Sequence, residues 1–405
     1  MPLLLVAIVA MLAQQTLATA AKTGVPVLFK PMADELQFDA ELVLVYTWGF
    51  ACVGITVMLG CGAFIRRFGA LRMTQIGCVL MAIGLALLST TAAPMTLVVA
   101  ILALVAATIS MGGTLSTPAS SQILARYAPA RWAPLVFSIK QTGVPAGVVL
   151  VSFLVPLITT HYGWRAAGLF FAGFCLLIAV ALQPCRKTFD QNRQPDYPLR
   201  FSSLADTFLA VLRIPGLRML AVAAFAFIGL QSIFLNFSVV YLAEELGYEL
   251  SVAGAALGTA TLIALPGRVF WGWVSSVWIT PRTLLICLAL AMIGASIALG
   301  LAEPEWAYWQ VMLPLLVLSA TAMSWHGVLL SETARLSPDD EVARMTGGVL
   351  AFGTAGQIGF PILFALGFAL GEYAGAYAII TIPAIVAVIA MSSAPKHTTD
   401  ETQQT

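Results

Sequence analysis

The sequence predicts an all-α membrane protein in which twelve transmembrane helices form two six-helix pseudo-repeats. Three observations predict this fold class: an apolar composition, twelve apolar runs of spanning length, and one long polar stretch near the middle of the chain. Hydrophobic residues make up 60% of the 405 residues, and charged residues make up only 10%. Because soluble domains usually carry about 25% charged residues, this composition indicates a protein embedded in the lipid bilayer.

Each apolar run is long enough to cross a bilayer, which takes about 20 residues of α-helix. The predicted spans lie approximately at residues 3–28, 41–62, 72–91, 95–122, 134–158, 164–183, 217–243, 251–277, 283–302, 306–331, 346–370 and 374–392. Only a short connection separates the third span from the fourth, and its Pro94 stops one helix before the next begins.

The long polar stretch lies between the sixth and seventh spans. It is rich in Arg, Lys and Asp, and Pro184, Pro195 and Pro198 break any long helix within it. We therefore expect a solvated cytoplasmic linker between two halves of six spans. The predicted divisions are an N-terminal half over residues 1–183, the linker over 184–215, a C-terminal half over 216–393 and a cytoplasmic tail over 394–405.

The charges of the loops predict the orientation in the membrane. With the N-terminus inside, the cytoplasmic loops and linker hold most of the basic residues, among them Arg66, Arg67, Arg72, Arg126, Arg131, Arg213, Arg218, Arg282, Arg335 and Arg344. The outer loops hold mainly acidic residues, among them Asp34, Glu35, Asp39, Glu244, Glu245, Glu249, Glu303, Glu305 and Glu372. Because an excess of Lys and Arg marks cytoplasmic loops, we expect both termini in the cytoplasm and a location in the cytoplasmic, or bacterial inner, membrane.

The first span has a second interpretation, because Ala18-Thr19-Ala20 resembles a signal-peptide cleavage site. However, neither Lys nor Arg precedes the apolar run, and removing it would leave eleven spans. We therefore favour a first transmembrane helix.

Several classes of function are disfavoured by composition. A net charge of +1, without a basic tract among aromatic residues, argues against a nucleic-acid partner. Six scattered cysteines without CxxC spacing indicate neither a disulfide framework nor a metal site, and we expect no cofactor. The apolar runs contain no recognisable pairing of nucleophile and base, so we expect a non-enzyme, and a monomer in the bilayer.

An internal repeat supports the division into halves. A constant offset of 210 residues pairs Gly62 with Gly272, Arg72 with Arg282, Gly84 with Gly294, and Gly143 with Gly353. The same offset aligns the second span with the eighth and the fifth with the eleventh. Parallel repeats of six spans are a transporter architecture, with the substrate site near the midplane between the halves.

The connection between the second and third spans resembles a known signature. Residues 62–72 read GAFIRRFGALR, which is similar to the G-x-L-x-D-R-x-G-R-R motif of the major facilitator superfamily. Gly62, Arg67 and Gly69 match this motif, and Arg72 lies one position beyond its end. Arg66 replaces the usual aspartate, and Ser276 stands at the equivalent position of the second half. The resemblance implies the major facilitator fold and alternating access.

The same resemblance implies that this loop takes part in the conformational change. The residues expected to act there are Gly62, Arg67, Gly69 and Arg72, with Gly272 and Arg282 in the second half.

Arg268 lies deep in the eighth span, where an arginine costs roughly 2.5–3.5 kcal/mol. We find no Asp or Glu deep in any predicted span, so an incoming anion is the favoured partner, and backbone carbonyls with water are the alternative. Its position resembles that of the arginine that holds a substrate carboxylate in monocarboxylate and oxalate carriers. The aspartate that precedes it by one turn in monocarboxylate carriers is replaced here by Ala264, and Gln357 stands on the eleventh span, where the oxalate carrier has a lysine.

Two lysines are the other basic residues inside predicted spans. Lys22 shares a helical face with Gln15, and Lys140 is followed by Gln141 and Pro145. Both lysines could line a cavity and bind substrate, or extend to the headgroup region instead.

Further polar residues complete the predicted site. Gln231 and Asn236 on the seventh span could orient a substrate or join helices, and Gln357 is a further candidate. His326 is the candidate for proton coupling, although a lone histidine is more often a packed residue.

These residues predict a secondary active transporter that moves a small organic anion, with a carboxylate favoured, by alternating access. A proton or sodium ion could be coupled by symport or antiport. The alternatives are an exporter of apolar or drug-like compounds and a channel.

Overall fold

The computed structural model describes residues 2–91, 95–199 and 203–393. Pro94 and the predicted tail over residues 394–405 lie outside the described residues. The elements of the described chain are α-helices and short 3-10 turns. Helices are the expected form in lipid because they satisfy every backbone hydrogen bond within one segment.

Seven α-helices form the described part of the N-terminal half. They are α1 (Pro2–Leu36), α2 (Val43–Phe68), α3 (Ala70–Ser89), α4 (Met95–Thr114), α5 (Ser116–Tyr127), α6 (Ala133–Gln141) and α7 (Gly143–Ala181). The linker carries α8 (Arg186–Phe189) and α9 (Ser203–Arg213). The C-terminal half contains α10 (Pro215–Glu244), α11 (Leu250–Val277), α12 (Pro281–Gly300), α13 (Tyr308–Ala322), α14 (His326–Leu336), α15 (Val342–Ile379) and α16 (Thr381–Ser393).

Two of the helices contain a reversal of the chain. Gly163 interrupts α7 with φ 82°, and Gly371 and Glu372 interrupt α15 with non-helical dihedral angles. After the second interruption the chain folds back, so that the backbones of Gly367 and Gly375 lie in contact. Among the described residues, ten segments are long and apolar enough to span a membrane. Eight single and two reversing segments are consistent with the predicted twelve crossings.

The linker is more ordered and more buried than its prolines suggest. An eleven-residue helix, α9, forms after Pro198, and Val211 on it is fully buried. In α8, Phe189 is buried and stacks edge-on against Tyr127 of α5. The expectation of a merely solvated linker is therefore wrong in part, because apolar side chains anchor both of its helices to the membrane-spanning bundle.

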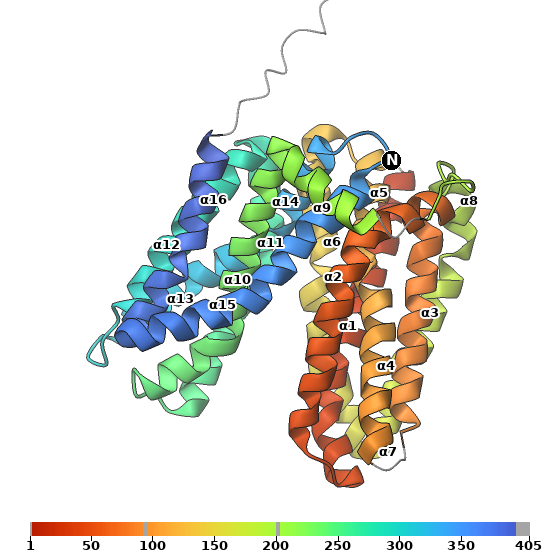
Figure 1. Cartoon of the computed structure of the whole chain (residues 1–405). Helices are drawn as coiled ribbons and strands as arrows, with labels where there is room; N and C mark the ends of the chain where they lie inside the picture. The colour runs from red at the N-terminus through yellow and green to blue at the C-terminus, as the bar shows by residue number, and fades with distance from the viewer. Residues whose placement is uncertain (1, 92–94, 200–202, 394–405) are drawn as a thin grey trace, which may run out of the picture.

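The two halves form separate bundles that meet at one end (Figure 1). This end also carries the N-terminus and the linker, and we call it the linker end; the bundles diverge toward the opposite end. One apolar cluster belongs to the C-terminal half and another to the N-terminal half. A third cluster joins both halves at the linker end, where Cys61 and Phe137 pack together with Leu330 and Leu350.

Two glycines show how closely the halves approach at the linker end. A Cβ atom at Gly62 on α2 would overlap Arg344 on α15, and a Cβ at Gly272 on α11 would overlap Ser138 on α6. Side chains at these positions would separate the helices. The repeat-related glycines thus occupy matching places in the two inter-half contacts.

Candidate functional site

The candidate site forms where helices of both halves meet at the end of α6. This helix continues almost directly into α7, and Lys140 lies in its last turn. Gly143 follows closely, and a Cβ atom there would lie 2.9 Å from the carbonyl oxygen of Leu12 on α1. The absence of a side chain at Gly143 therefore brings the segment around Lys140 close to the polar residues of α1.

Lys140 is buried, with 1% of its surface exposed. Its ammonium Nζ donates to the Oε1 atom of Gln15 at 2.5 Å and to the Oε1 atom of Gln141 at 3.2 Å. Both acceptors are neutral amide oxygens. Within the described ranges Lys140 forms no ion pair, so its charge has hydrogen-bond partners but no counter-ion.

A hydrogen-bond network extends from Gln15 to α5. The hydroxyl of Ser116 donates to the side-chain oxygens of Gln14 at 2.7 Å and Gln15 at 3.1 Å, and that of Thr117 donates to Gln15 at 3.3 Å. The buried Nε2 atom of Gln14 has no partner among the described residues. The network therefore holds the amide that accepts from Lys140 and leaves one donor free.

Arg268 reaches this cluster from the opposite half. Its Nη1 atom donates to the backbone oxygen of Gln141 at 2.7 Å. The guanidinium is buried, with 1% of the residue exposed, and the structure shows no partner for its Nε atom within the described part of the chain. It also lies close enough to Lys140 for their charges to repel each other. Two cations, one from each half, thus share one buried region.

His326 lies beside these cations. It begins α14 after a break in the helix at Met323–Trp325, and its ring stacks on Trp325 with centroids 3.9 Å apart. Arg268 and Lys140 both act electrostatically on the imidazole. His326 is therefore a third polar group beside the two buried cations.

Other predicted site residues lie apart from this cluster. Lys22 is exposed, with Nζ 5.2 Å from the ring centroid of Phe50, and is seven residues, or about 10 Å, along α1 from Gln15. Asn236 donates to the backbone of Ser232 in its own helix.

Gln357 is exposed, and the Oε1 atom of Gln231 is buried without a partner among the described residues. These contacts do not join the predicted residues Lys22, Asn236, Gln357 and Gln231 to Arg268 and Lys140. Their predicted part in substrate binding remains a prediction.

Sequence reasoning missed Gln14 and Ser116. Gln14 is fully buried, and Ser116 is 1% exposed. Two consecutive glutamines in an otherwise apolar run were a usable signal, because both amides must find partners inside the bilayer.

The buried carboxylates of the described chain do not serve these cations. Glu332 is 3% exposed and accepts from Arg335 through both carboxylate oxygens, at 2.6 and 2.8 Å. Asp190, the other buried carboxylate among the described residues, lies in the linker. The buried cations therefore face a region that is positive and lacks negative charge.

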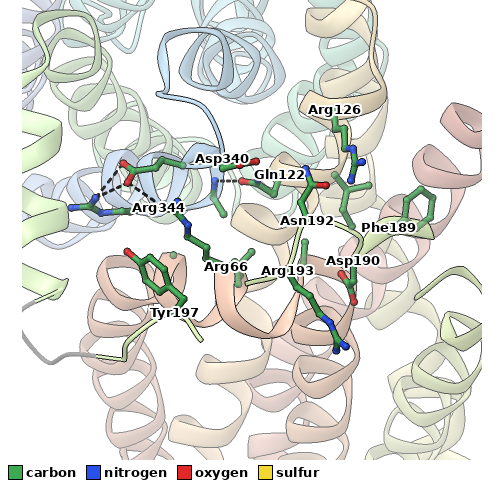
Figure 2. Close-up of a pocket in the computed structure, with 17 residues that line it drawn as sticks. Arg66, Gln122, Arg126, Phe189, Asp190, Asn192, Arg193, Tyr197, Asp340 and Arg344 are labelled. Carbon is green, nitrogen blue, oxygen red and sulfur yellow. Dashed lines mark hydrogen bonds and ion pairs between the residues drawn. The ribbon is translucent and has the colours of Figure 1, made fainter. Parts of the chain in front are cut away.

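The motif loop between α2 and α3 lines a pocket at the linker end (Figure 2). Arg344 and Tyr197 lie on one side of it and Asp190 and Phe189 on the other. Glu341, at the start of α15, pairs with Arg344 at 3.1 Å and with Arg66 at 3.6 Å. Arg66 therefore takes part in an ion pair between the halves.

The linker also binds this loop. Arg66 donates to Gln194 at 3.0 Å and lies over the ring of Tyr197, whose backbone oxygen accepts from Arg67 at 3.4 Å. These contacts connect the end of α2 to the irregular linker segment that follows α8.

Asp190 caps the N-terminus of α3. It accepts from the backbone nitrogens of Leu71 at 2.7 Å and Arg72 at 3.0 Å, beside Gly69, whose φ of 98° favours glycine. Burial raises the pKa of this carboxyl, although the two hydrogen bonds oppose the rise. Arg282, the repeat mate of Arg72, instead donates to the backbone oxygen of Met391 at 2.5 Å.

Several solved structures share this arrangement at low sequence identity. A bacterial homologue of the iron transporter ferroportin, in an outward-facing state, has a TM-score of 0.78 and 12% identity over 96% of this chain and 98% of that chain. The Escherichia coli fucose:proton symporter has a TM-score of 0.73 and 16% identity, covering 95% and 97% of the two chains. The human organic anion transporter MFSD10 has a TM-score of 0.71 and 15% identity, covering 95% and 98%.

Sequence comparison gives the family. None of the curated proteins compared matched this chain. The family model described as "Major Facilitator Superfamily" matches residues 3–347, which is most of the sequence. This match shows that the chain belongs to the major facilitator superfamily.

Proposed function

We propose that this transporter carries a small organic anion, with a carboxylate as the recognised group, by alternating access as a secondary active carrier. The single observation that supports this cargo is the pair Arg268 and Lys140, buried together without a counter-ion. Breaking a buried ion pair commonly costs about 3–5 kcal/mol, because one charge is left uncompensated. An anion that binds between these cations removes that cost each time it enters.

The unfilled hydrogen-bonding groups favour a carboxylate over a spherical anion. The free Nε of Arg268 and the free Nε2 of Gln14 are donors, and Lys140 supplies an ammonium. A planar carboxylate offers two oxygens and matches the fork of a guanidinium. Binding between groups of opposite halves also links occupancy to the movement of those halves.

The proposed orientation places the linker end in the cytoplasm of a cytoplasmic or bacterial inner membrane. The linker-end loops are rich in arginine, whereas the opposite loops carry few basic residues. The positive-inside rule assigns loops rich in Lys and Arg to the cytoplasm. In this orientation both termini are cytoplasmic. The bundles then meet at the cytoplasmic end and diverge toward the outside (Figure 1), as an outward-facing carrier requires.

A ligand screen on the purified protein tests the cargo. Carboxylates that bind the folded state should raise its thermal unfolding temperature, since saturation at 100 times Kd stabilises by about 2.7 kcal/mol. The panel is glycolate, glycerate, oxalate, malonate, succinate and citrate, with chloride and phosphate as competitors. Arg268→Gln should weaken binding roughly 10- to 150-fold, which corresponds to about 1.5–3 kcal/mol for a charge-assisted hydrogen bond.

Lys30→Gln is the matched control. Lys30 is an exposed cation on α1, the helix that carries Gln15, and its removal should leave the shift unchanged. Equal shifts of the unfolding temperature in Arg268→Gln and wild type would refute the proposal. Uptake of the anion by Arg268→Gln in vesicles, with the apparent affinity of wild type, would refute it as well. Competition by phosphate as strong as that of the carboxylates would show that charge alone is recognised.

A further inference from the structure

The charge balance of the buried site leads to an inference about coupling, which rests on the proposed anion function. Lys140 and Arg268 come from opposite halves, and each is 1% exposed. Their partners are the neutral oxygens of Gln15 and Gln141. When the site is empty, two positive charges would therefore face each other in a medium of low polarity.

The elements around Lys140 supply no negative charge within the described ranges. On α1 it donates to Gln15. Gln15 accepts in turn from Ser116 and Thr117 of α5, and all three residues are neutral. The charged or titratable groups near it are Arg268 on α11 and His326 on α14. Glu332, also on α14, is held by Arg335.

The two cations differ in what they can release. A guanidinium keeps its proton under all conditions relevant to proteins, whereas a buried lysine amine loses its proton readily. The repulsion between the two groups is therefore relieved most easily by deprotonation of Lys140. A neutral amine can still donate to the Oε1 atom of Gln15, so that hydrogen bond survives.

We propose that Lys140 carries the coupled proton. Its amine is neutral when the site is empty, takes a proton from the open side when a carboxylate binds, and returns it on the opposite side when the carboxylate leaves. The step forms one N–H bond from a solvent proton and breaks no bond in the cargo. A monocarboxylate and one proton together move no net charge, so the carrier is an electroneutral symporter for such a cargo.

His326 and sodium are poorer carriers of the coupling charge. A proton on His326 would add a third positive charge beside Arg268 and Lys140, which repel it. Sodium requires oxygen ligands. The side-chain oxygens of Gln15 and Gln141 and the backbone oxygen of Gln141 already accept from Lys140 and Arg268.

Proton uptake per bound anion tests the assignment. The purified full-length protein is titrated in weakly buffered detergent solution with the panel carboxylate that stabilises it most, and pH is followed with an indicator dye. Wild type should take up about one proton per anion near neutral pH, by linkage between the two binding events. Lys140→Arg keeps the positive charge but holds its proton permanently, so the ratio should fall below about 0.2 at whatever affinity remains.

Two further variants make the result decisive. Lys140→Met, which lacks a titrating group, should also lose proton uptake, and serves if Lys140→Arg does not fold. His326→Gln should keep a ratio of about one, because His326 remains uncharged in this scheme. Loss of proton uptake in His326→Gln, or its persistence in a folded Lys140 variant, overturns the proposal.

The outcomes separate coupling from cargo. Anion binding to wild type without proton uptake refutes the role of Lys140 and leaves the anion function standing. Failure of every panel carboxylate to bind wild type refutes the anion function itself. In vesicles, a monocarboxylate current in Lys140→Arg, with electroneutral uptake in wild type, would confirm the transferred proton.

Discussion

The contact between α2 and α15 and the contact between α6 and α11 are related by the 210-residue repeat, and they have the same backbone plan. Gly62 meets Arg344 in the first, and Gly272 meets Pro134 and Ser138 in the second. Pro134 is the repeat mate of Arg344. The side chains one to two turns further along the helices differ, however. Met58 stands where the second contact has Arg268.

The difference separates scaffold from site. In the first contact, Met58 packs against Gly347 and accepts from Thr354 at 3.5 Å through its sulfur atom. In the second, Arg268 donates to Gln141 at 2.7 Å. Lys140 likewise has an apolar mate, Leu350, which packs in the shared cluster. The glycines thus allow close helix packing in both contacts. The charges of Arg268 and Lys140 belong to the contact between α6 and α11 only.

The linker end shows a second asymmetry. Arg66 pairs across the halves with Glu341, but its repeat mate Ser276 accepts from the backbone nitrogen of Leu135 at 3.2 Å. One contact is therefore fastened by charge and the other by a neutral hydrogen bond.

Moving the lysine to the apolar contact should have the largest effect. Leu350→Lys places an ammonium in the shared apolar cluster, where Cys61 and Leu330 offer no acceptor comparable to Gln15. We expect a loss of about 3–5 kcal/mol in stability, because the charge is buried without a partner. Lys140→Leu should leave stability within about 1 kcal/mol, since apolar replacement of buried charges is often neutral. Thermal unfolding in detergent measures both, and equal losses would contradict the distinction between the contacts.

Adding a side chain at either contact glycine should have an intermediate effect on the packing of the two halves. Gly62→Ala and Gly272→Ala introduce a Cβ atom that overlaps the facing helix, and overpacking commonly costs about 1–3 kcal/mol. The closed linker end should therefore become less populated by roughly tenfold. Cys61 is a native reporter, because it is 2% exposed at this contact. In a variant with Cys61 as its one cysteine, maleimide labelling should accelerate for both substitutions.

The same assay checks that both contacts open together. Gly294→Ala is the matched control, because a Cβ atom at Gly294 meets no described atom within 4 Å. Acceleration by Gly62→Ala alone would show that the two contacts open independently.

Loss of the cross-half ion pair should have the smallest effect. Glu341→Gln removes the partner of Arg66 and Arg344, whose side chains are 27% and 22% exposed. Partly solvated pairs contribute about 0.2–1 kcal/mol, so Cys61 labelling should rise by roughly one and a half to five times, and less at high salt. Asp340→Asn is the matched control, because Asp340 forms no ion pair with the described residues. An equal rise in that variant would exclude a specific role for Glu341.

Much of the fold could be predicted from the sequence because the bilayer restricts the choices. About 20 apolar residues per crossing are readable without tertiary information, and so is the polar stretch that divides the halves. The helix α9 was missed because prolines mark where a helix stops but do not show that Val211 will be buried against the bundle. By contrast, the pairing of Glu332 with Arg335 can be predicted from their three-residue spacing on one helix.

By itself, the sequence determined that Arg268 lies within an apolar span and that no carboxylate accompanies it there. This follows from composition along one helix. Only the tertiary structure decided that Lys140, 128 residues earlier, lies beside it and that Lys22 does not. Helical periodicity gives the face on which a side chain lies, but not the helix that this face meets. That choice depends on how closely the glycine-bearing helices of the two halves approach.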